Sequence, residues 1–233
     1  MKILALETSA KAVSAAVTET GTVIASCYQD AGLTHSVTLM PMVEAMLKNA
    51  GLALANCGAV AVAVGPGSFT GIRIGVAAAK GLAFGAGIPA VGVSTLEAMV
   101  VPLAHLDAII ICAMDARRQQ VYNAIFRTRG GFWYRKSPDR AISLEDLTGE
   151  LQGRDYFPKI LVGDGAELCR DYLASRGICC ELAPPHLLRQ SAVGVALAAE
   201  KKAAEGQLVS AQELAPVYLR PVHAVKLADR PDA

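Results

Sequence analysis

Apolar residues occur along the chain in short runs that alternate with amphipathic stretches, and this order predicts an α/β fold. Three β-prone runs separated by polar turns predict a three-stranded meander over residues 3–6, 13–17 and 23–28. Helical spacing of apolar residues predicts a helix over 37–47, with Pro41 in its first turn or at a kink. A second unit follows, with a buried strand over 59–64, a glycine-rich loop over 65–71, a helix over 72–84 and a buried strand over 89–93.

The second half of the chain repeats two features of the first half. An acid followed six residues later by the start of a strand occurs at Glu7 and again at Asp115, 108 residues further on. A strand followed by Gly-x-Gly occurs at Gly65 and again at Gly163, an offset of 98. Coincidence could explain each match alone, but both matches in order indicate a duplication. We therefore predict an α/β fold of two duplicated actin-like (ASKHA) lobes, each a mixed sheet with helices, that face a common cleft. The lobes would span residues 1–104 and 105–233, the second with a C-terminal extension.

The composition is that of a folded domain without a strong overall charge. Hydrophobic residues make up 53% of the chain, charged residues 18%, and the formal net charge is +1, so neither disorder nor a general attraction to nucleic acid is expected. The uncharged stretch 81–96 is shorter than the about 20 apolar residues of a membrane helix, and glycines and a proline interrupt it. Only residues 3–6 are apolar ahead of Glu7, which is too few for a signal peptide. We expect a cytoplasmic protein with no membrane attachment.

The cysteines and histidines are too scattered to predict a metal site or a disulfide framework. None of the six cysteines belongs to a C-x2-C pair. Leu39 stands four residues after His35, where a second zinc ligand on the same helix face would fall. The four histidines are widely separated at His35, His105, His186 and His223. We therefore expect no metal.

The glycine loop and the two acidic turns supply the candidate nucleotide-cleft residues, which are Glu7, Thr8, Ser9, Gly65, Gly67, Ser68 and Asp115. A loop between a buried strand and a helix could hold an anion on free backbone N–H groups. However, Thr70 stands where a dinucleotide-binding loop has its third glycine, and Ile72 and Arg73 stand where a P-loop has Lys and Ser or Thr. The alternative, which we favour, is a tight strand-to-helix turn with close helix packing.

The acidic turns could coordinate the Mg²⁺ of a nucleotide, because this ion uses one or two carboxylates together with phosphate oxygens. Both turns lack the glycine that a close approach of backbone to phosphate requires. In the second turn, the side chains of Arg117 and Arg118 would crowd a phosphate. We therefore expect the remnant of a nucleotide cleft, and no phosphoryl transfer by this chain alone.

Residues 115–140 form a basic segment, with seven Arg or Lys side chains against two Asp, a local balance of +5. Aromatic residues such as Trp133 are interleaved with them, and basic side chains beside exposed aromatics are typical of RNA contact. A solvated hairpin around Gly130 and Gly131 would have the same composition, and we favour the hairpin.

The two predicted helices of the first half are candidates for a partner surface. Apolar residues spread round more of the first helix than one core-facing stripe needs, and half of the six methionines, which suit adaptable surfaces, lie there. In the second helix, Gly71, Gly75 and Ala79 form a ridge that permits close packing. The alternative is that both helices are buried within the chain. The candidate partner interface comprises Leu39, Met42, Val43, Met46, Arg73, Val76, Ala77 and Lys80.

Five segments together resemble the TsaB family, formerly called YeaZ, along nearly the whole chain. They are Ile-Leu-Ala-Leu-Glu-Thr-Ser at 3–9, the glycine loop with its following arginine at 65–75, Gly-Val-Ser-Thr-Leu at 92–96, Asp-Ala-Arg at 115–117 and Pro-Val-Tyr-Leu-Arg at 216–220. The resemblance implies an actin-like two-lobed fold. It also implies a bacterial subunit of the machinery that makes N6-threonylcarbamoyladenosine at position 37 of tRNAs reading ANN codons.

The resemblance further implies a paralogous catalytic partner, TsaD, which would carry an H-x-x-x-H metal motif, and an ATPase partner, TsaE. The chain alone would form a homodimer through the same surface that binds TsaD. ATP would be used by the complex, tRNA would be reached indirectly through it, and this chain would bind no cofactor firmly. The alternatives are a metallopeptidase, which the older glycoprotease label of the family suggests, and an independent ASKHA phosphotransferase. The missing metal ligands and the glycine-free turns disfavour both, so we predict a non-catalytic scaffold subunit.

Overall fold

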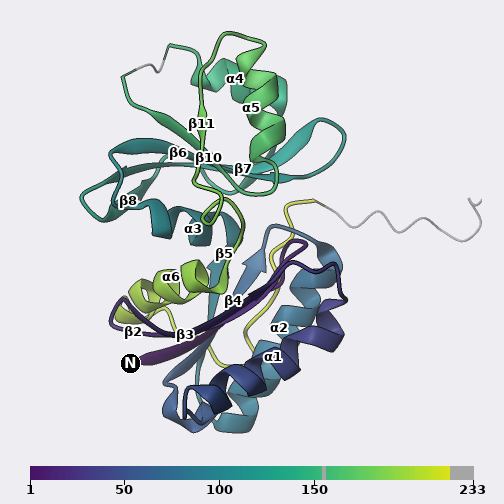
Figure 1. Cartoon of the computed structure of the whole chain (residues 1–233), viewed down its shortest axis with the longest axis vertical. Coiled ribbons are helices and arrows are strands. Elements are labelled where there is room, and N and C mark those ends of the chain that lie inside the picture. Colours follow the sequence, from purple (N-terminus) through teal and green to yellow (C-terminus); the bar gives the residue numbers. More distant parts are fainter. Residues whose placement is uncertain (154–155, 221–233) are drawn as a thin grey trace, which may run out of the picture.

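A computed structural model gives the structure of residues 1–153 and 156–220, in which the chain forms two lobes (Figure 1). One lobe contains the strands of the first half, and the other contains the strands of the second half. His223 and the predicted extension beyond residue 220 lie outside the described residues. None of the helices in the described part of the chain combines the length and the apolarity needed to cross a bilayer.

The first sheet has five strands in the order β3-β2-β1-β4-β5. Its antiparallel part is the predicted meander, with β1 (Lys2–Glu7), β2 (Val13–Glu19) and β3 (Thr22–Gln29). β4 (Ala59–Gly65) pairs in parallel with β1, and β5 (Ala90–Ser94) pairs in parallel with β4. Every residue of β4 is buried, which its uninterrupted apolar sequence predicted.

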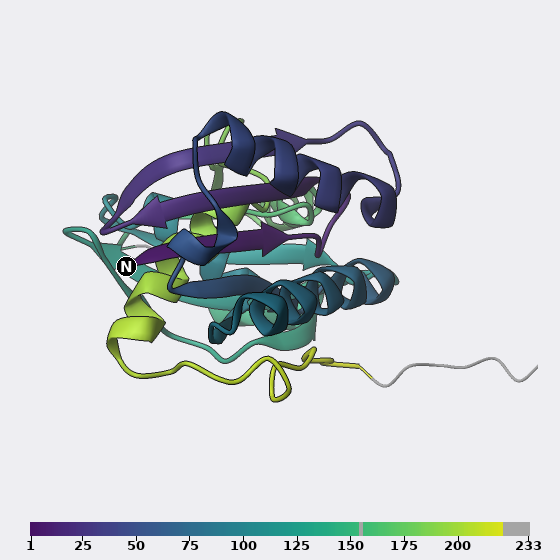
Figure 2. The ribbon, with the colours of Figure 1, turned by 90° about the horizontal axis from the view of Figure 1, so that it is seen from below.

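Two long helices, α1 (His35–Asn49) and α2 (Phe69–Ala86), lie side by side over one face of this sheet (Figure 2). A 3-10 turn, η1 (Leu54–Asn56), precedes β4. α2 begins three residues earlier than predicted because Ser68 caps it, its Oγ accepting a hydrogen bond from the Gly71 amide at 3.3 Å. α2 ends where Gly87 adopts a φ of 65°, a left-handed conformation that favours glycine.

The second sheet repeats the topology of the first. Its order is β8-β7-β6-β10-β11, so each strand takes the position of β3, β2, β1, β4 or β5. The strands are β6 (Ala108–Asp115), β7 (Gln120–Arg129), β8 (Phe132–Arg135), β10 (Lys159–Val162) and β11 (Glu181–Leu182). β9 (Arg140–Ser143) also pairs with β7, and α4 (Leu144–Leu151) and α5 (Ala166–Ala174) complete the lobe. The predicted duplication is confirmed, and with it the α/β fold of two actin-like lobes.

One helix from each half of the chain packs against the other lobe. α3 (Thr95–Val100), which continues from β5 and leads into the 3-10 turn η2 (Val101–Leu103), places Leu96 and Met99 in the core of the second lobe. α6 (Ala192–Ala204) follows the second sheet but packs against β1, β2 and β4 of the first. The two helices cross at Gly194, where an added Cβ would lie 2.1 Å from the Ala98 carbonyl oxygen. The division of the chain at residue 105 stays a prediction. In the structure, α3 contacts strands of both sheets, and α6 packs against the first sheet.

Residues 207–220, which we call the C-terminal strap, follow α6 along the first lobe (Figure 2). Val209 forms an isolated antiparallel bridge with Ala90 of β5, and Leu214 is buried in the first core. The Val217 amide donates to the Val64 carbonyl oxygen at 2.8 Å, so the strap reaches the end of β4, where the glycine loop begins. A segment that sequence reasoning assigned to the second lobe therefore completes the first.

Candidate functional site

The acid of the first turn, Glu7, is enclosed at the end of β1. Its side chain is 1% exposed, and Oε1 accepts a hydrogen bond from the Ser9 amide at 2.5 Å. Oε2 has no hydrogen-bond partner among the described residues. Burial raises the pKa of Glu7 from 4.5 to about 7, the hydrogen bonds from Ser9 oppose this rise, and the charge of Asp164 in the second lobe adds to it.

The acid of the second turn, Asp115, has an equivalent backbone partner, the amide two residues later, but a different environment. Oδ1 accepts a hydrogen bond from the Arg117 amide at 2.7 Å, which repeats the bond from Ser9 to Glu7. Asp115 is exposed at the end of β6. Beyond it, Arg117, Arg118 and Gln119 adopt φ values of 62°, 54° and 56°, in the left-handed region that costs a side-chain-bearing residue free energy.

The glycines of the loop after β4 allow α2 to pack directly on the first hairpin turn. An added Cβ would lie 2.4 Å from the Ser9 carbonyl oxygen at Gly67, and 2.1 Å from the Thr8 carbonyl oxygen at Gly71. The Ser68 amide, which would be a phosphate donor, instead donates to the Ser9 carbonyl oxygen at 2.7 Å. The space beside these glycines is therefore filled by protein, which supports the tight-turn interpretation over the anion loop.

The second Gly-x-Gly packs in the same way. An added Cβ at Gly163 would lie 2.1 Å from the Ala113 carbonyl oxygen, and one at Gly165 would lie 2.9 Å from the Asp115 amide nitrogen. The Gly165 amide donates to the Ala113 carbonyl oxygen at 3.0 Å. Both halves of the duplication thus use glycine to bring a helix start against the turn of the neighbouring hairpin.

A cleft of about 830 Å³ separates the two turns and includes the start of α2. Of the predicted cleft residues, four line it, namely Ser9, Gly67, Ser68 and Asp115. Glu7, Thr8 and Gly65 do not line it, and Gly65 instead packs against the strap, where an added Cβ would lie 2.4 Å from the Val217 carbonyl oxygen. From the second lobe, Asp164 also faces the cleft, and burial raises its pKa against the hydrogen bond from Gln190.

The cleft lining carries charges of both signs, the acids Asp115 and Asp164 and the bases Lys11 and Arg117. At Gly67, the first hairpin turn occupies the space of a side chain. That this chain binds no nucleotide firmly stays a prediction. Within residues 1–153 and 156–220, no group of three or more His, Cys, Asp or Glu side chains is placed to hold a metal ion.

The structure places most of the predicted partner interface in the core of the first lobe. Leu39, Met42, Val43, Met46 and Val76 are between 1% and 8% exposed and pack together in one cluster with strands of the first sheet. A charge at Met46 would therefore disturb the core of the chain itself, although Met42 and Met46 also line a groove between α1 and β3. The candidate interface stays a prediction. The sheet and α2 cover part of the apolar surface of α1, whereas Val37 and Met40 on the same helix are exposed. Gly71 and Gly75 likewise face the first hairpin turn.

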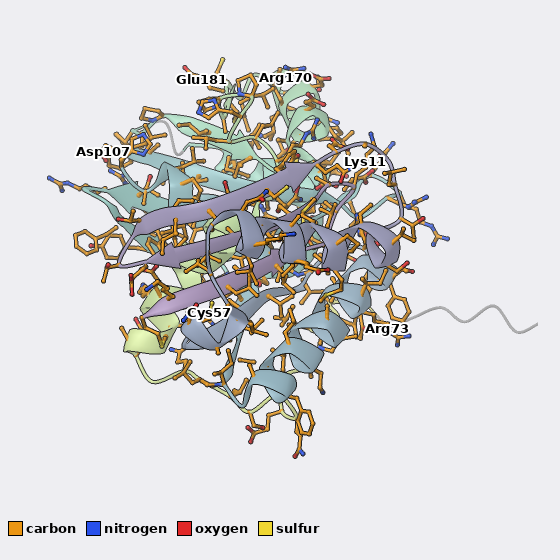
Figure 3. The ribbon with its side chains drawn as sticks, turned by 60° about the horizontal axis from the view of Figure 1, so that its bottom comes forward. Lys11, Cys57, Arg73, Asp107, Arg170 and Glu181 are labelled. Atoms are coloured by element: carbon orange, nitrogen blue, oxygen red, sulfur yellow. The ribbon has the colours of Figure 1, made fainter. Side chains whose placement is uncertain are left out.

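The remaining candidates lie on the outward side of α2. Arg73 and Ala77 are exposed, and Lys80 is half-buried, with Nζ donating to the strap carbonyls of Gln212 at 3.0 Å and Leu214 at 3.1 Å. Arg73 lies at the surface in Figure 3. Sequence reasoning missed Phe84, which is 74% exposed. Its spacing from Arg73 and Ala77, which are eleven and seven residues earlier, is the helical signal that would have found it.

The basic segment forms the hairpin that we favoured, with β7 and β8 joined at Gly130 and Gly131. Several of its charges are paired within the chain. Arg127 pairs with Asp107, and Arg140 donates to both carboxylate oxygens of Glu150.

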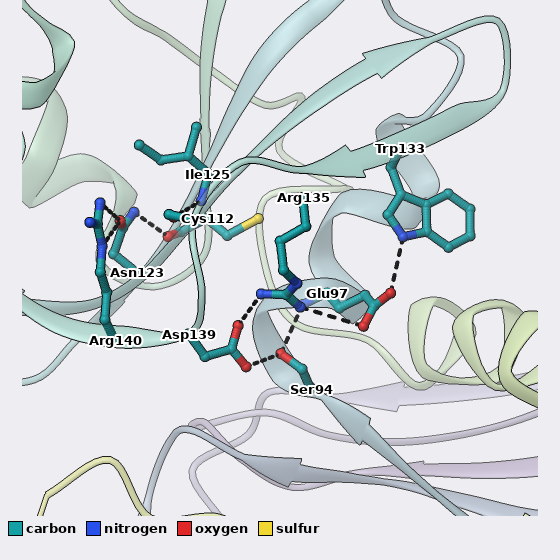
Figure 4. A network of polar contacts seen from close by, with 10 residues as sticks. Ser94, Glu97, Cys112, Asn123, Ile125, Trp133, Arg135, Asp139 and Arg140 are labelled. Atoms are coloured by element: carbon teal, nitrogen blue, oxygen red, sulfur yellow. Dashed lines mark hydrogen bonds and ion pairs between the residues drawn. The ribbon is translucent and has the colours of Figure 1, made fainter. Parts of the chain in front are cut away.

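Arg135 belongs to a network at the junction of the lobes (Figure 4). It donates to Asp139 at 2.5 Å and lies 3.5 Å from Glu97 of α3, while Ser94 Oγ at the end of β5 donates to Asp139 at 2.5 Å. The single tryptophan, Trp133, donates from Nε1 to Glu97 at 3.1 Å, so it too contributes to this junction.

Comparison with known proteins agrees with this architecture. The chain is 35% identical over 224 residues to a Bacillus subtilis protein named tRNA threonylcarbamoyladenosine biosynthesis protein TsaB, with 94% of each chain covered. An Escherichia coli protein of the same name is 33% identical over 230 residues, covering 94% of this chain and 95% of its own. This chain belongs to the TsaB family.

Solved structures and a family model also match this TsaB-family chain. The structure titled YeaZ from Pseudomonas aeruginosa superposes with a TM-score of 0.80 at 28% identity, covering 94% of this chain and 99% of that one. Residues 27–217 match the family model described as TsaD: tRNA N6-adenosine threonylcarbamoyltransferase. An ethanolamine utilization protein, EutJ from Carboxydothermus hydrogenoformans, shares the fold at 13% identity and a TM-score of 0.52.

Proposed function

We propose that this chain is a non-catalytic scaffold subunit required for N6-threonylcarbamoylation of adenosine 37 in tRNAs reading ANN codons. It would act in the cytoplasm with a TsaD-type catalytic subunit and a TsaE-type ATPase. The observation that carries the proposal is the contrast between the cleft, whose glycine loop is filled by its own hairpin turn, and the outward side of α2, which carries exposed apolar and basic side chains. Its family membership supports the same pathway.

The cleft argues against catalysis by this chain alone. Phosphoryl transfer needs backbone donors and a metal at the phosphates, whereas the Ser68 amide is bonded to Ser9 and the two cleft acids face the open space. A metallopeptidase needs a cluster of metal ligands, and the described residues do not bring one together. We therefore propose that ATP is used by the assembled complex, and that this chain binds no cofactor firmly.

The outward side of α2 is where we expect the TsaD-type subunit to dock. It presents Ala77, Gly81 and Phe84 at helical spacing, and the Cβ position of Gly81 is open, so a partner helix can approach closely. The same surface would form the homodimer when the chain is alone. Homodimer and heterodimer would then compete for one face. tRNA would be bound through the assembled complex.

Reconstitution tests this function. The TsaD-type and TsaE-type subunits are mixed with tRNA, ATP and a threonylcarbamoyl donor, with and without this chain, and N6-threonylcarbamoyladenosine is measured in digested tRNA. We expect product only with the chain present. Ala77→Glu should abolish it, whereas Ala174→Glu, a matched charge on the exposed end of α5, should not. Product formation without the chain, or peptide or ATP hydrolysis by the purified chain alone, would contradict the proposal.

A further inference from the structure

Arg73, on the outward side of α2, lies against two aromatic rings, one from α2 itself and one from the C-terminal strap. Its guanidinium carbon lies 3.8 Å from the centre of the Phe69 ring and 5.9 Å from the centre of the Tyr218 ring. Nε donates a hydrogen bond to the Tyr218 hydroxyl at 2.9 Å, and the two rings lie 5.1 Å apart. Stacking and this hydrogen bond restrict a side chain that would otherwise lose considerable rotamer entropy on binding.

The two terminal nitrogens of Arg73 are left for a ligand. Within the described part of the chain, no hydrogen bond or ion pair uses Nη1 or Nη2, and no acid pairs with this guanidinium. Arg127, Arg135 and Arg140 differ in this respect, since each of them pairs with a carboxylate. A fixed, planar, unpaired guanidinium suits bidentate recognition of a carboxylate or a phosphate.

The surroundings favour a protein carboxylate over the phosphate of a nucleic acid. Along the same side of α2 lie Ala77, Gly81 and Phe84, which form an apolar strip with one cation at its end. The next basic residue, Lys80, is held by strap carbonyls. Nucleic-acid surfaces rely on several free cations in a row, whereas one anchoring arginine beside apolar and aromatic residues is typical of a protein interface.

The strap positions this arginine. Tyr218 is set in place because Val217 bonds to the end of β4 and because Arg220 reaches the second lobe, where Nη1 donates to the Ala116 carbonyl oxygen at 2.6 Å. The aromatic support of Arg73 thus depends on the strap as well as on α2. We propose that Arg73, held between Phe69 and Tyr218, is the anchor of the docking surface and receives a carboxylate of the TsaD-type subunit. This inference rests on the proposed function.

The test measures binding of the TsaD-type subunit to the full chain by titration calorimetry or light scattering, after thermal unfolding shows that each variant is folded. Arg73→Lys keeps the charge but loses the planar fork, and we expect it to weaken binding about tenfold or more. Tyr218→Leu should cost a similar factor, and Tyr218→Phe, which keeps the ring, should cost less. Arg176→Lys is the matched control, because Arg176 also stacks on a tyrosine, Tyr172, and bonds to its hydroxyl, but lies in the second lobe.

A readout of charge separates a carboxylate contact from a packing effect. Binding of the wild-type chain should weaken from 50 to 500 mM NaCl more steeply than binding of Arg73→Gln, because the variant lacks the ion pair that salt screens. If the affinity of Arg73→Lys for the TsaD-type subunit stays within twofold of the wild type, this inference is overturned but the proposed function is not. The same holds if the variant loses only tRNA binding by the assembled complex, which would indicate that Arg73 contacts a phosphate. Absence of association by the wild-type chain would overturn the proposed function as well.

Discussion

The acid at the end of β1 is buried, whereas its counterpart at the end of β6 is exposed, although both accept a hydrogen bond from the amide two residues later. The two lobes share strand order, hairpin turn and Gly-x-Gly packing. They differ in what covers the turn. In the first lobe, Gly67 and Gly71 pack on Ser9 and Thr8, the residues that follow Glu7. In the second lobe, the turn continues into the strained residues 117–119. The duplication therefore conserves a packing scheme, and the environment of each acid is set by its neighbours.

The shared packing scheme predicts the largest effects. Gly71→Ala should lower the free energy of unfolding by about 3 kcal/mol, because the new Cβ would lie 2.1 Å from a backbone oxygen that cannot move freely. Gly165→Ala should cost less, since its nearest neighbour is 2.9 Å away. Urea unfolding measures both. Gly149→Ala in α4, where nothing lies within 4 Å, is the control and should be neutral or slightly stabilising. Equal stability of Gly71→Ala and the control would contradict the close packing of α2 on the first turn.

The buried acid of the first turn predicts an effect of pH on stability. The folded chain holds the proton of Glu7 up to a pKa of about 7, whereas the unfolded chain releases it near 4.5. The unfolded state therefore binds fewer protons between these values, and Glu7 destabilises the fold increasingly as pH rises from 4.5 to 7. At about 1.4 kcal/mol per pKa unit, this amounts to about 3 kcal/mol.

Glu7→Gln tests this effect. We measure the free energy of unfolding in urea from pH 5 to 8. The difference between the variant and the wild type should rise in favour of the variant between pH 5 and 7 and then level off. Asp115→Asn, at the matching exposed position, should show no such gain. A constant difference between Glu7→Gln and the wild type across this range would show that the burial of Glu7 does not control its titration.

The smallest effect concerns RNA and the basic hairpin of the second lobe. Arg129 and Lys136 are exposed, and replacing both with glutamine should lower the tRNA affinity of the assembled complex by less than tenfold, because most neighbouring arginines are paired within the chain. Filter binding at fixed salt measures this change. A loss of a hundredfold or more would mean that the hairpin is a tRNA-binding surface and that the lobes differ in function as well as in packing.

The candidate partner surface shows what sequence reasoning could not decide. Helical spacing located both helices, but it could not tell which of their apolar sides the sheet would cover. Met42 and Met46 were attractive as adaptable surface residues, yet the first sheet and α2 bury them. The aromatic support of Arg73 was also out of reach, since Tyr218 lies 145 residues away in the chain.

The order of strands, turns and helices was determined by the sequence itself, because alternation, apolar runs, glycines and caps act over a few residues. The meander, the repeated acidic turns and the two Gly-x-Gly loops could all be recognised in this way. Only the tertiary structure decided that α3 and α6 exchange lobes, that Glu7 is buried while Asp115 is not, and that the strap holds Arg73. These features depend on contacts between segments far apart in the chain, and burial is a property of such contacts that local patterns do not encode.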